Sequence, residues 1–569
     1  MFALNEKRII TLYIIIMFLM GVMFFKLYSL AVGDYSQILP ALTNQYTRKL
    51  NAAERRGFVF DRYGNIIAGF EDGYNCVIDP SKIPMAYIST PETFDDAANK
   101  IFNIRSNRNI SQSEIKEQLT DGKPFVMRIT ENINNEYMMS FQNYKRNETP
   151  SPAALHITGY VNKEGKGTGG IEEVYDDFLK KTSAKIDVVY ESNALRQSFG
   201  GSPLRITDYG YNKKTGITLT IDIDLQKKTE EIADKYFKKG AIVVALADTG
   251  EILASVSRPT YSTDNLAAYI DSENGEFINR AFSSFTPGSV FKTIIAAAAL
   301  EYDKNYYNKE YECTGIINAG GKSFNCNRKW GHGIMTMREA YAESCNTYFM
   351  NLALEIGYDR IYDMAKKLGI GEYTALDGLN VKSGNIPEIN NPPPAFIANA
   401  SIGQGELLIT PLEAVRIFCC IANDGVMPEL SLVKSFVFEN KIADAGNYAA
   451  KKVLGGYTVK CLLEMAEACV EHGTGIPAAP EYGIAGGKTS SAESGQYTKI
   501  EVFNEETGEK GRQNVQIVHS WFSGYYPSNT DKEYPTYAIS VIAEGGVTEN
   551  IKSASVFKEI CDYLSKIIR

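Results

Sequence analysis

The stretch from Ile9 to Phe25 contains no charged residue, and it constrains the fold more than any other part of the chain. Lys26 follows, and the sequence remains apolar through Val32. A membrane-spanning helix needs about 20 mostly apolar residues, and this segment reaches that length if the Lys26 ammonium extends to the lipid headgroups. Because lipid cannot satisfy an open backbone, such a segment must be helical. We therefore expect a single transmembrane helix over residues 9–32.

The residues on either side of this helix predict its orientation. Lys7 and Arg8 precede it, and positive charges favour the cytoplasmic side of a membrane. We therefore expect residues 1–8 in the cytoplasm and the bulk of the chain outside, in a single-pass protein of the cell membrane. The alternative is a cleaved signal peptide, because Ser29-Leu30-Ala31 resembles a small-x-small cleavage site. The apolar segment exceeds the about 7–15 residues of a signal-peptide core, which favours the anchor.

Length and composition limit the remaining possibilities. A chain of 569 residues is too long for one ordinary core, so we expect more than one domain. Apolar residues at 44% and charged residues at 22% are typical of a folded globular protein. The net charge of −9 argues against a nucleic-acid partner, because proteins that bind nucleic acids usually carry a basic face.

The cysteines and histidines do not predict a metal site. Nine cysteines are present, most of them in apolar helical segments, where buried free thiols are expected. Cys313 and Cys326 flank a glycine-rich loop and are candidates for a disulfide outside the cell. No cysteine spacing resembles a zinc site, and the four histidines are scattered. A metal site or a histidine-based triad therefore has little support.

Two regions follow the anchor. Residues 33–212 are polar and mixed, with short strand and helix patterns; residues 56–68 predict two strands around a Gly64-Asn65 turn. No catalytic pattern stands out there, so we expect a non-catalytic, membrane-proximal pedestal of mixed α+β structure. Residues 213–569 begin with a strand at 217–221 and a helix at 222–238.

The second region predicts one sheet built from both of its ends. The apolar strands 241–247 and 252–256 flank Asp248-Thr249-Gly250, a strong hairpin pattern. Helical segments fill the middle, strands return at 521–526 and 537–543, and a last helix covers 555–568. We therefore expect an α/β (α+β) domain, with a mostly antiparallel sheet, helices on its faces, and ends that meet.

Ser289 and Lys292 form the first of three motifs that carry chemistry. Three positions apart on a predicted helix of residues 289–300, they share a face. A serine hydroxyl needs a base, and Lys292 can accept a proton only when burial or a second cation keeps its amine neutral. The helix N-terminus would stabilise an oxyanion near Ser289. Alone, the Ser-x-x-Lys pattern has little specificity, and an ordinary N-terminal helix residue would explain Ser289 as well.

Two further motifs supply the groups that such a site needs. Ser344 and Asn346 flank Cys345 and would relay a proton and hold a substrate backbone. Lys488-Thr489 follows a Gly-Gly pair on a predicted strand, where it would bind a substrate carboxylate while the strand pairs with an extended peptide. The backbone N–H of Ser491 would be a second oxyanion donor. The order of the three motifs is more informative than any of them alone.

With these motifs, the chain resembles the class B penicillin-binding proteins, the monofunctional D,D-transpeptidases of bacterial cell-wall synthesis. The resemblance spans nearly the whole chain and includes the single anchor. The other motifs that carry it are Arg56-Gly57 with Asp61-Arg62-x-Gly64, Gly169-Gly170-Ile171-Glu172, Thr220-Ile221-Asp222, Asn279-Arg280-Ala281, Thr286-Pro287-Gly288-Ser289, Ile402-Gly403-Gln404-Gly405, Thr410-Pro411, Gly473-Thr474-Gly475 and His519-Ser520-Trp521-Phe522-Ser523-Gly524.

The resemblance implies a role for each site residue. Ser289 would be the acylated nucleophile and Lys292 its base. Ser344 and Asn346 would assist proton transfer and substrate binding, and Lys488, with Thr489, would hold the terminal carboxylate of a stem peptide ending in D-Ala-D-Ala. An amine from a neighbouring strand would resolve the acyl-enzyme into a cross-link. β-Lactams would acylate the same serine, and no metal or organic cofactor is implied. A membrane-embedded glycosyltransferase of the SEDS family is the implied partner, and the role in cell elongation (cell shape), division or sporulation is left open.

One residue departs from the family pattern. Ser490 stands where the family usually has glycine, and its Cβ and hydroxyl would crowd the approach of substrate to the edge strand. This departure favours the main alternative, a catalytically weak anchored scaffold whose site no longer turns over and which organises a partner glycosyltransferase. A bifunctional penicillin-binding protein, a secreted β-lactamase and a signalling β-lactam receptor are less consistent with the sequence. Residues 33–212 show no glycosyltransferase carboxylate motif, the anchor and pedestal do not suit a β-lactamase, and the chain has no His-Glu-x-x-His motif.

Overall fold

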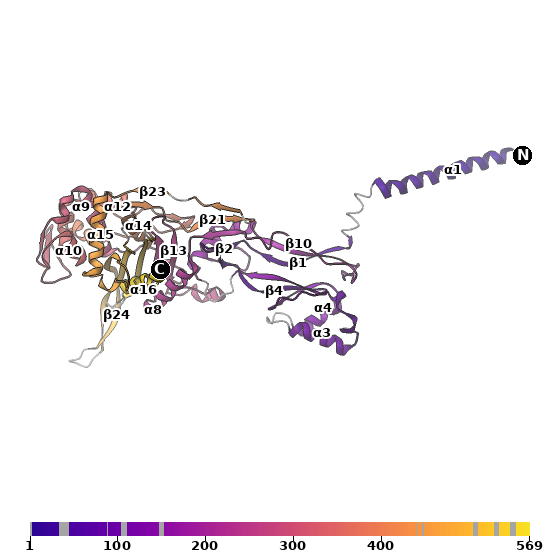
Figure 1. Cartoon of the computed structure of the whole chain (residues 1–569), viewed down its shortest axis with the longest axis horizontal. Coiled ribbons are helices and arrows are strands. Elements are labelled where there is room, and N and C mark those ends of the chain that lie inside the picture. Colours follow the sequence, from indigo (N-terminus) through magenta and orange to yellow (C-terminus); the bar gives the residue numbers. More distant parts are fainter. Residues whose placement is uncertain are drawn as a thin grey trace. The chain divides into compact units, whose positions relative to one another are not determined.

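The computed structural model describes residues 3–33, 45–87, 89–103, 111–146, 153–439, 441–446, 449–503, 510–528, 534–546 and 553–568 (Figure 1). The chain forms two compact units that alternate along the sequence. The first unit comprises Met1–Arg56, Glu71–Lys145 and Ser183–Lys213, and the second comprises Gly57–Phe70, Arg146–Thr182 and Lys214–Arg569. The expected boundary after residue 212 therefore marks only the last crossing between the units.

The apolar N-terminal segment is helical, as predicted. Helix α1 covers Ala3–Tyr28 and continues as a π-helical turn over Ser29–Gly33. Within the described residues, Glu6–Val32 is the one helical segment long and apolar enough to cross a membrane, and none of it is buried against the protein.

Besides α1, the described part of the first unit contains two three-stranded sheets and a pair of helices. One sheet has the order β1-β9-β10, formed by Thr47–Arg55, Ala184–Glu191 and Arg205–Asp208. The other has the order β5-β4-β6, formed by Phe125–Ile129, Phe70–Ile78 and Met138–Lys145. Helices α3 (Pro91–Asn103) and α4 (Gln112–Asp121) pack on the second sheet through Ala98 and Ile115.

The hairpin predicted at 56–68 belongs to the second unit. Strands β2 (Phe58–Phe60) and β3 (Ile66–Ala68) are antiparallel, and Asp61 closes their turn by accepting hydrogen bonds from the backbone N–H groups of Tyr63 and Asn65. β2 also pairs in parallel with β11 (Gly216–Leu219), within a sheet of order β22-β21-β11-β2-β3. This long-range pairing, which local pattern does not reveal, places the hairpin in the second unit.

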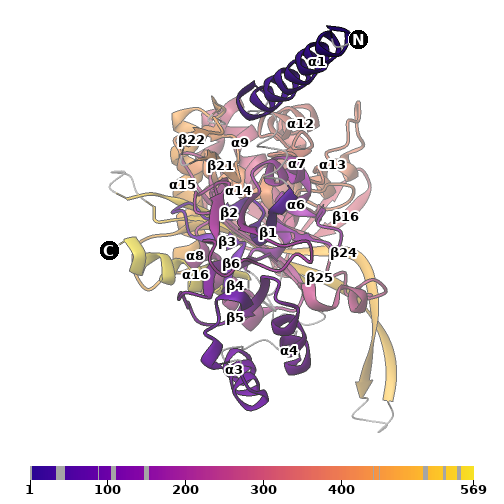
Figure 2. The same cartoon turned by 90° about the vertical axis from the view of Figure 1, so that its right-hand side faces the viewer.

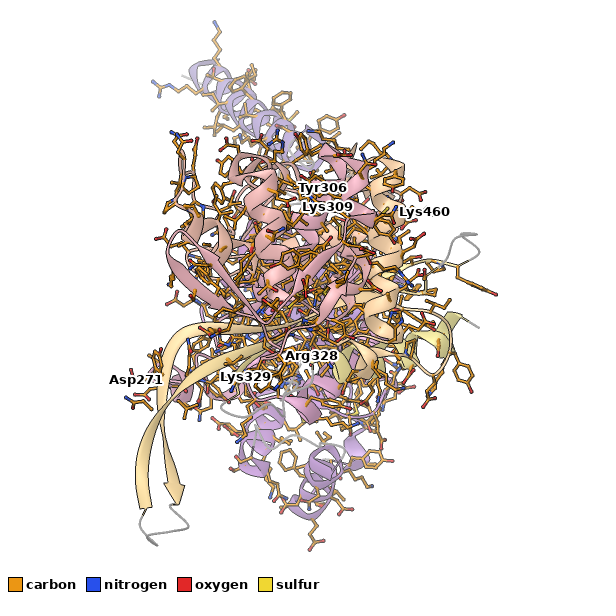
Figure 3. The ribbon with its side chains drawn as sticks, turned by 90° about the vertical axis from the view of Figure 1, so that its left-hand side faces the viewer. Asp271, Tyr306, Lys309, Arg328, Lys329 and Lys460 are labelled. Carbon is orange, nitrogen blue, oxygen red and sulfur yellow. The ribbon has the colours of Figure 1, made fainter. Side chains whose placement is uncertain are left out.

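The central sheet of the second unit is antiparallel and has the order β13-β12-β26-β25-β24. Its strands are β12 (Gly240–Leu246), β13 (Ile252–Arg258), β24 (Gly486–Phe503), β25 (Lys510–Tyr526) and β26 (Tyr537–Gly546). Strands from both ends of the region meet where β12 pairs with β26, which confirms the predicted α+β sheet. β24 is the edge strand, and its hairpin with β25 extends well beyond the other strands (Figures 2 and 3).

Alternating residues of β12 separate the two cores of this unit. Ala241 and Val243 face a core that includes α9 (Lys292–Tyr302), α11 (Asn346–Ile356), α14 (Pro411–Ala422) and α15 (Gly456–Glu471). Ile242 and Val244 face a core with α8 (Ile223–Tyr236) and α16 (Ser553–Ile568). The period of two is that of a strand buried on both faces.

Shorter elements complete the second unit. Its remaining helices are α5 (Leu155–Thr158), α6 (Gly170–Val174), α7 (Asp176–Lys181), α10 (Met337–Ala342), α12 (Tyr358–Lys367) and α13 (Pro394–Ser401). Its remaining strands are β7 (Tyr160–Val161), β8 (Gly167–Thr168), β14 (Tyr311–Cys313), β15 (Ile316–Ala319), β16 (Lys322–Asn325), β17 (Gly333–Met335), β18 (Ala375–Leu376), β19 (Leu379–Asn380), β20 (Val426–Pro428), β21 (Val433–Phe438), β22 (Lys441–Asp444) and β23 (Ala450–Lys452).

Candidate active site

Ser289 lies in a 3₁₀ turn over Gly288–Phe291, directly before α9. The sequence predicted one continuous helix from Ser289, and the tighter turn is a difference. Gly288 has a φ of +54°, which favours glycine, and its N–H donates to the Gly403 carbonyl at 3.0 Å. The turn therefore brings the Ser289 backbone close to its neighbours while its side chain lines a cavity.

Lys292 is fully buried at the first position of α9. Its Nζ donates to Asn346 Oδ1 at 2.6 Å, to the Ser344 carbonyl at 2.8 Å and to Ser344 Oγ at 3.2 Å. Burial, and then the positive charge of Lys488, hold the pKa of the Lys292 amine well below its ordinary value. A lowered pKa favours the neutral amine that a base requires.

Ser344 connects this amine to Ser289. Its Oγ donates to Ser289 Oγ at 3.1 Å and accepts from Lys292 Nζ. Ser344 has a φ of +55°, a left-handed conformation that is uncommon for serine and often found at functional sites. Among the described residues no hydrogen bond joins Lys292 directly to Ser289. The hydrogen-bonded path between Lys292 and Ser289 therefore passes through the Ser344 hydroxyl.

The third motif lies on the edge strand β24, where side chains alternate. Lys488 and Ser490 are buried, whereas Thr489 and Ser491 face outward. Lys488 Nζ donates to the Thr489 carbonyl at 3.0 Å, and burial lowers the pKa of its amine. Thr489 Oγ1 lies 2.6 Å from Thr474 Oγ1. Two hydroxyls therefore stand at the surface above a buried lysine.

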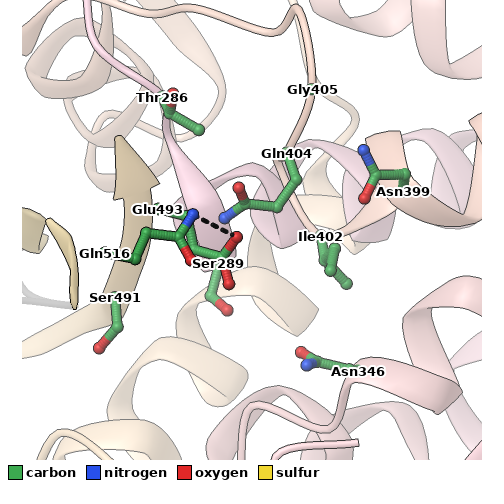
Figure 4. A pocket seen from close by; sticks show the side chains of 10 residues that line it. All are labelled: Thr286, Ser289, Asn346, Asn399, Ile402, Gln404, Gly405, Ser491, Glu493 and Gln516. Carbon is green, nitrogen blue, oxygen red and sulfur yellow. Dashed lines mark hydrogen bonds between the residues drawn. The ribbon is translucent and has the colours of Figure 1, made fainter. Parts of the chain in front are cut away.

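Ser289 lines two polar cavities, each of about 440–460 Å³. One contains Ser344, Thr474, Thr489, Ser490 and Ser491. The other, in Figure 4, contains Thr286, Asn399, Gln404, Glu493 and Gln516; there Gln516 Nε2 donates to Glu493 Oε2 at 3.0 Å. Asn346 and Ser491 line both cavities. Ser289 therefore borders both cavities, an arrangement that would suit a transfer reaction in which donor and acceptor approach from different sides.

A family model described as the penicillin binding protein transpeptidase domain matches residues 240–562, more than half of the chain. The chain belongs to this transpeptidase family. The peptidoglycan D,D-transpeptidase MrdA of Escherichia coli K12 is 26% identical over 491 residues, which cover 77% of this chain and 76% of that protein. The resemblance to penicillin-binding transpeptidases is confirmed.

Solved structures share the fold of this transpeptidase. One, from a peptidoglycan synthase complex that coordinates polymerization and crosslinking, has a TM-score of 0.67 at 22% identity and covers 97% of both chains. Penicillin binding protein 3 of Mycobacterium tuberculosis, complexed with aztreonam, has a TM-score of 0.61 at 21% identity, covering 91% of this chain and 97% of that one. The expected fold class is therefore confirmed.

Next to the catalytic motifs, this transpeptidase has a cluster of sulfur and nitrogen ligands. The side-chain ligand atoms of Cys313, Cys326, His332 and Cys345 all lie within 4.8 Å of one another. His332 Nδ1 is 3.5 Å from the sulfurs of Cys313 and Cys326, and the thiols of Cys326 and Cys345 are 3.7 Å apart. The Cys326–Cys345 hydrogen bond lowers the pKa of the first thiol and raises that of the second.

The sequence missed this cluster. All nine cysteines are free and buried, so Cys313 and Cys326 do not form the disulfide that was considered. Three thiols and one imidazole are a common donor set for tetrahedral zinc. Pairing of β14 with β17 brings Cys313 and His332 together, and the loop with Arg328 and Lys329 (Figure 3) lies between Cys326 and His332. No short Cys-x-x-Cys spacing marks a site assembled in this way.

Proposed function

We propose that this transpeptidase cross-links peptidoglycan through an acyl-enzyme on Ser289. The observation that carries the proposal is the hydrogen-bonded path from Lys292 Nζ through Ser344 Oγ to Ser289 Oγ, which starts at a buried amine of lowered pKa. When both hydrogen bonds reverse, so that Ser289 donates to Ser344 and Ser344 donates to a neutral Lys292 amine, this path can remove the hydroxyl proton as the oxygen attacks a carbonyl carbon.

In acylation, Ser289 Oγ attacks the carbonyl of the penultimate D-Ala of a stem peptide. The Oγ–C bond forms, the hydroxyl proton moves through Ser344 towards neutral Lys292, and the C–N bond to the last D-Ala breaks. The departing amine takes a proton from the same path. Attack of an amine from a second strand then releases Ser289 and completes the cross-link.

The donor peptide would bind along β24. An extended peptide can pair with this edge strand, while the hydroxyls of Thr489 and Thr474 hold its terminal carboxylate. The buried Lys488 would attract the carboxylate electrostatically and keep Lys292 neutral. The second cavity, with Glu493 and Gln516, would admit the acceptor.

The sulfur and nitrogen cluster would hold a zinc ion with a structural role. Cys313, Cys326, His332 and Cys345 would supply four protein ligands, the number that closed structural zinc sites use. When bound, zinc would fix Cys345, and thereby the flanking Ser344 and Asn346, without taking part in acyl transfer.

Helix α1 would anchor the protein in the cell membrane, with residues 1–8 inside and the rest outside. The first unit would act as the non-catalytic pedestal, and a SEDS-family glycosyltransferase would be the partner. A solved structure with this fold comes from a peptidoglycan synthase complex, which is consistent with such an arrangement.

The test is acylation by a fluorescent penicillin, followed by cross-linking of a pentapeptide donor with an amine acceptor. We expect label on the wild type that excess unlabelled penicillin prevents and that Ser289→Ala abolishes. Cross-linked product should be absent from Ser289→Ala. Label that persists in Ser289→Ala would exclude Ser289 as the nucleophile.

The scaffold alternative is favoured by one contact, that of Ser490 with the Ser289 backbone N–H. A scaffold predicts no label and no product on the wild type even when the partner glycosyltransferase is present. Label together with product would exclude it.

A further inference from the structure

The hydroxyl of Ser490 accepts a hydrogen bond from the backbone N–H of Ser289, the proposed nucleophile. The N–H of Ser289 donates to Ser490 Oγ at 2.7 Å, and the Ser490 side chain is 5% exposed. This N–H lies on the 3₁₀ turn that precedes α9, next to the carbon that Ser289 Oγ would attack. In acyl transfer such donors must point to the carbonyl oxygen that becomes negative.

The turn that carries Ser289 lies between the Ser490 hydroxyl and Gly403. A Cβ placed on Gly288 would lie 2.2 Å from Ser490 Oγ, so the hydroxyl rests directly against the Gly288–Ser289 peptide. On its other side Gly288 contacts Gly403, where a Cβ would lie 2.1 Å from the Gly288 carbonyl oxygen. The turn therefore cannot easily withdraw from Ser490.

We propose that Ser490 closes the oxyanion hole of the resting enzyme and must rotate away before Ser289 can be acylated. This inference rests on the proposed acyl-enzyme. One N–H makes one strong hydrogen bond, so the substrate carbonyl competes with the hydroxyl for the same donor. Ser490 is a positioning residue: it satisfies the partly buried N–H of Ser289 while the site is empty and slows acylation by substrates that displace it poorly.

The energetic scale follows from the hydrogen bond that must be exchanged. A neutral hydrogen bond contributes about 0.5–1.5 kcal/mol net, which corresponds to about two- to tenfold in rate. Removing the hydroxyl should therefore raise the acylation rate constant two- to tenfold. The same factor should apply to the affinity of a boronic acid that forms a tetrahedral adduct on Ser289, because one of its oxygens occupies the oxyanion position.

Two variants distinguish the effect of the Ser490 hydroxyl from the effect of its Cβ. Ser490→Ala removes only the hydroxyl, and Ser490→Gly also removes the Cβ that would crowd the edge strand. We expect both variants to react faster with fluorescent penicillin and to bind the boronic acid more tightly, with Tm measured to confirm that each is folded.

Each remaining outcome contradicts a specific statement. Faster acylation of Ser490→Gly alone would assign the effect to the Cβ and overturn the role of the hydroxyl. Equal or slower acylation of both variants would also overturn it. Absence of label from the wild type and from both variants would instead overturn the proposed acyl-enzyme on which this inference rests.

Discussion

One short turn contributes to two buried clusters of different kinds. Ser344 and Asn346 contact Lys292 in the catalytic cluster, whereas Cys345, between them, contacts Cys326 in the sulfur cluster. The catalytic cluster is satisfied by hydrogen bonds between protein groups. The sulfur cluster instead gathers donors of the kind that bind a metal.

This difference suggests that the two clusters have different roles. The catalytic groups must exchange protons, so they are linked by hydroxyls and an amine whose protonation can change. The sulfur cluster would fix the position of Cys345, which lies on the other side of the same turn. If so, changes in the first cluster should affect chemistry without loss of stability, and changes in the second should affect stability first.

The largest effect is expected from Lys292→Met. Loss of the base should lower the acylation rate by about 10³–10⁴-fold, the upper range for general acid–base catalysis. Tm should not fall, because methionine fills the space without the desolvation cost of a buried amine. Lys228→Met, on the surface of α8, is the matched control and should react like the wild type. A fall in Tm together with activity would indicate a structural role for Lys292.

Next in size is the loss of a ligand from the sulfur cluster. Purified wild-type protein should contain about one zinc ion per chain by elemental analysis. Cys313→Ser should lose this zinc, and its Tm should be several degrees lower than that of the wild type. Cys419→Ser, a change of another buried thiol in α14, is the control and should keep the metal. Metal-free wild-type protein of unchanged Tm would contradict a structural zinc site.

A smaller effect should come from the second buried lysine. The acylation rate should increase with pH as Lys292 loses its proton. Lys488→Met removes a positive charge and should therefore raise the pKa of Lys292. The increase in acylation rate should then occur at higher pH. Lys488→Arg keeps the charge and is the control. An unchanged profile in Lys488→Met would show that burial alone keeps Lys292 neutral.

The same pKa determines how stability depends on pH. Between the lowered pKa of Lys292 and its ordinary value of 10.5, the unfolded chain binds more protons at this residue than the folded chain. Stability therefore rises with pH across this window. Lys292→Met should remove this contribution in denaturant titrations at several pH values.

The sequence predicted those features that depend on nearby residues. The spacing of Ser289 and Lys292, the 241–256 hairpin and the β24 motif were all read from local pattern. The features it missed depend on distant contacts: β2 pairs with β11, and β14 pairs with β17 to bring Cys313 near His332. The crowding by Ser490 was predicted, but its hydrogen bond to Ser289 was not, because it joins residues about 200 positions apart.

The smallest predicted effect comes from two buried threonine hydroxyls, one beside each cluster. Thr347 Oγ1 donates to Cys313 Sγ at 3.0 Å, while Thr293 Oγ1 lies 2.8 Å from the Tyr341 hydroxyl, in the catalytic half. Thr347→Val and Thr293→Val each remove one buried hydroxyl, worth about 1 kcal/mol. We expect about fivefold weaker zinc binding for Thr347→Val, measured by competition with a chelator, and no change in zinc binding for Thr293→Val. If both variants bound zinc equally weakly compared with the wild type, the clusters would not be separate units, because a change beside the catalytic groups would also weaken the zinc site.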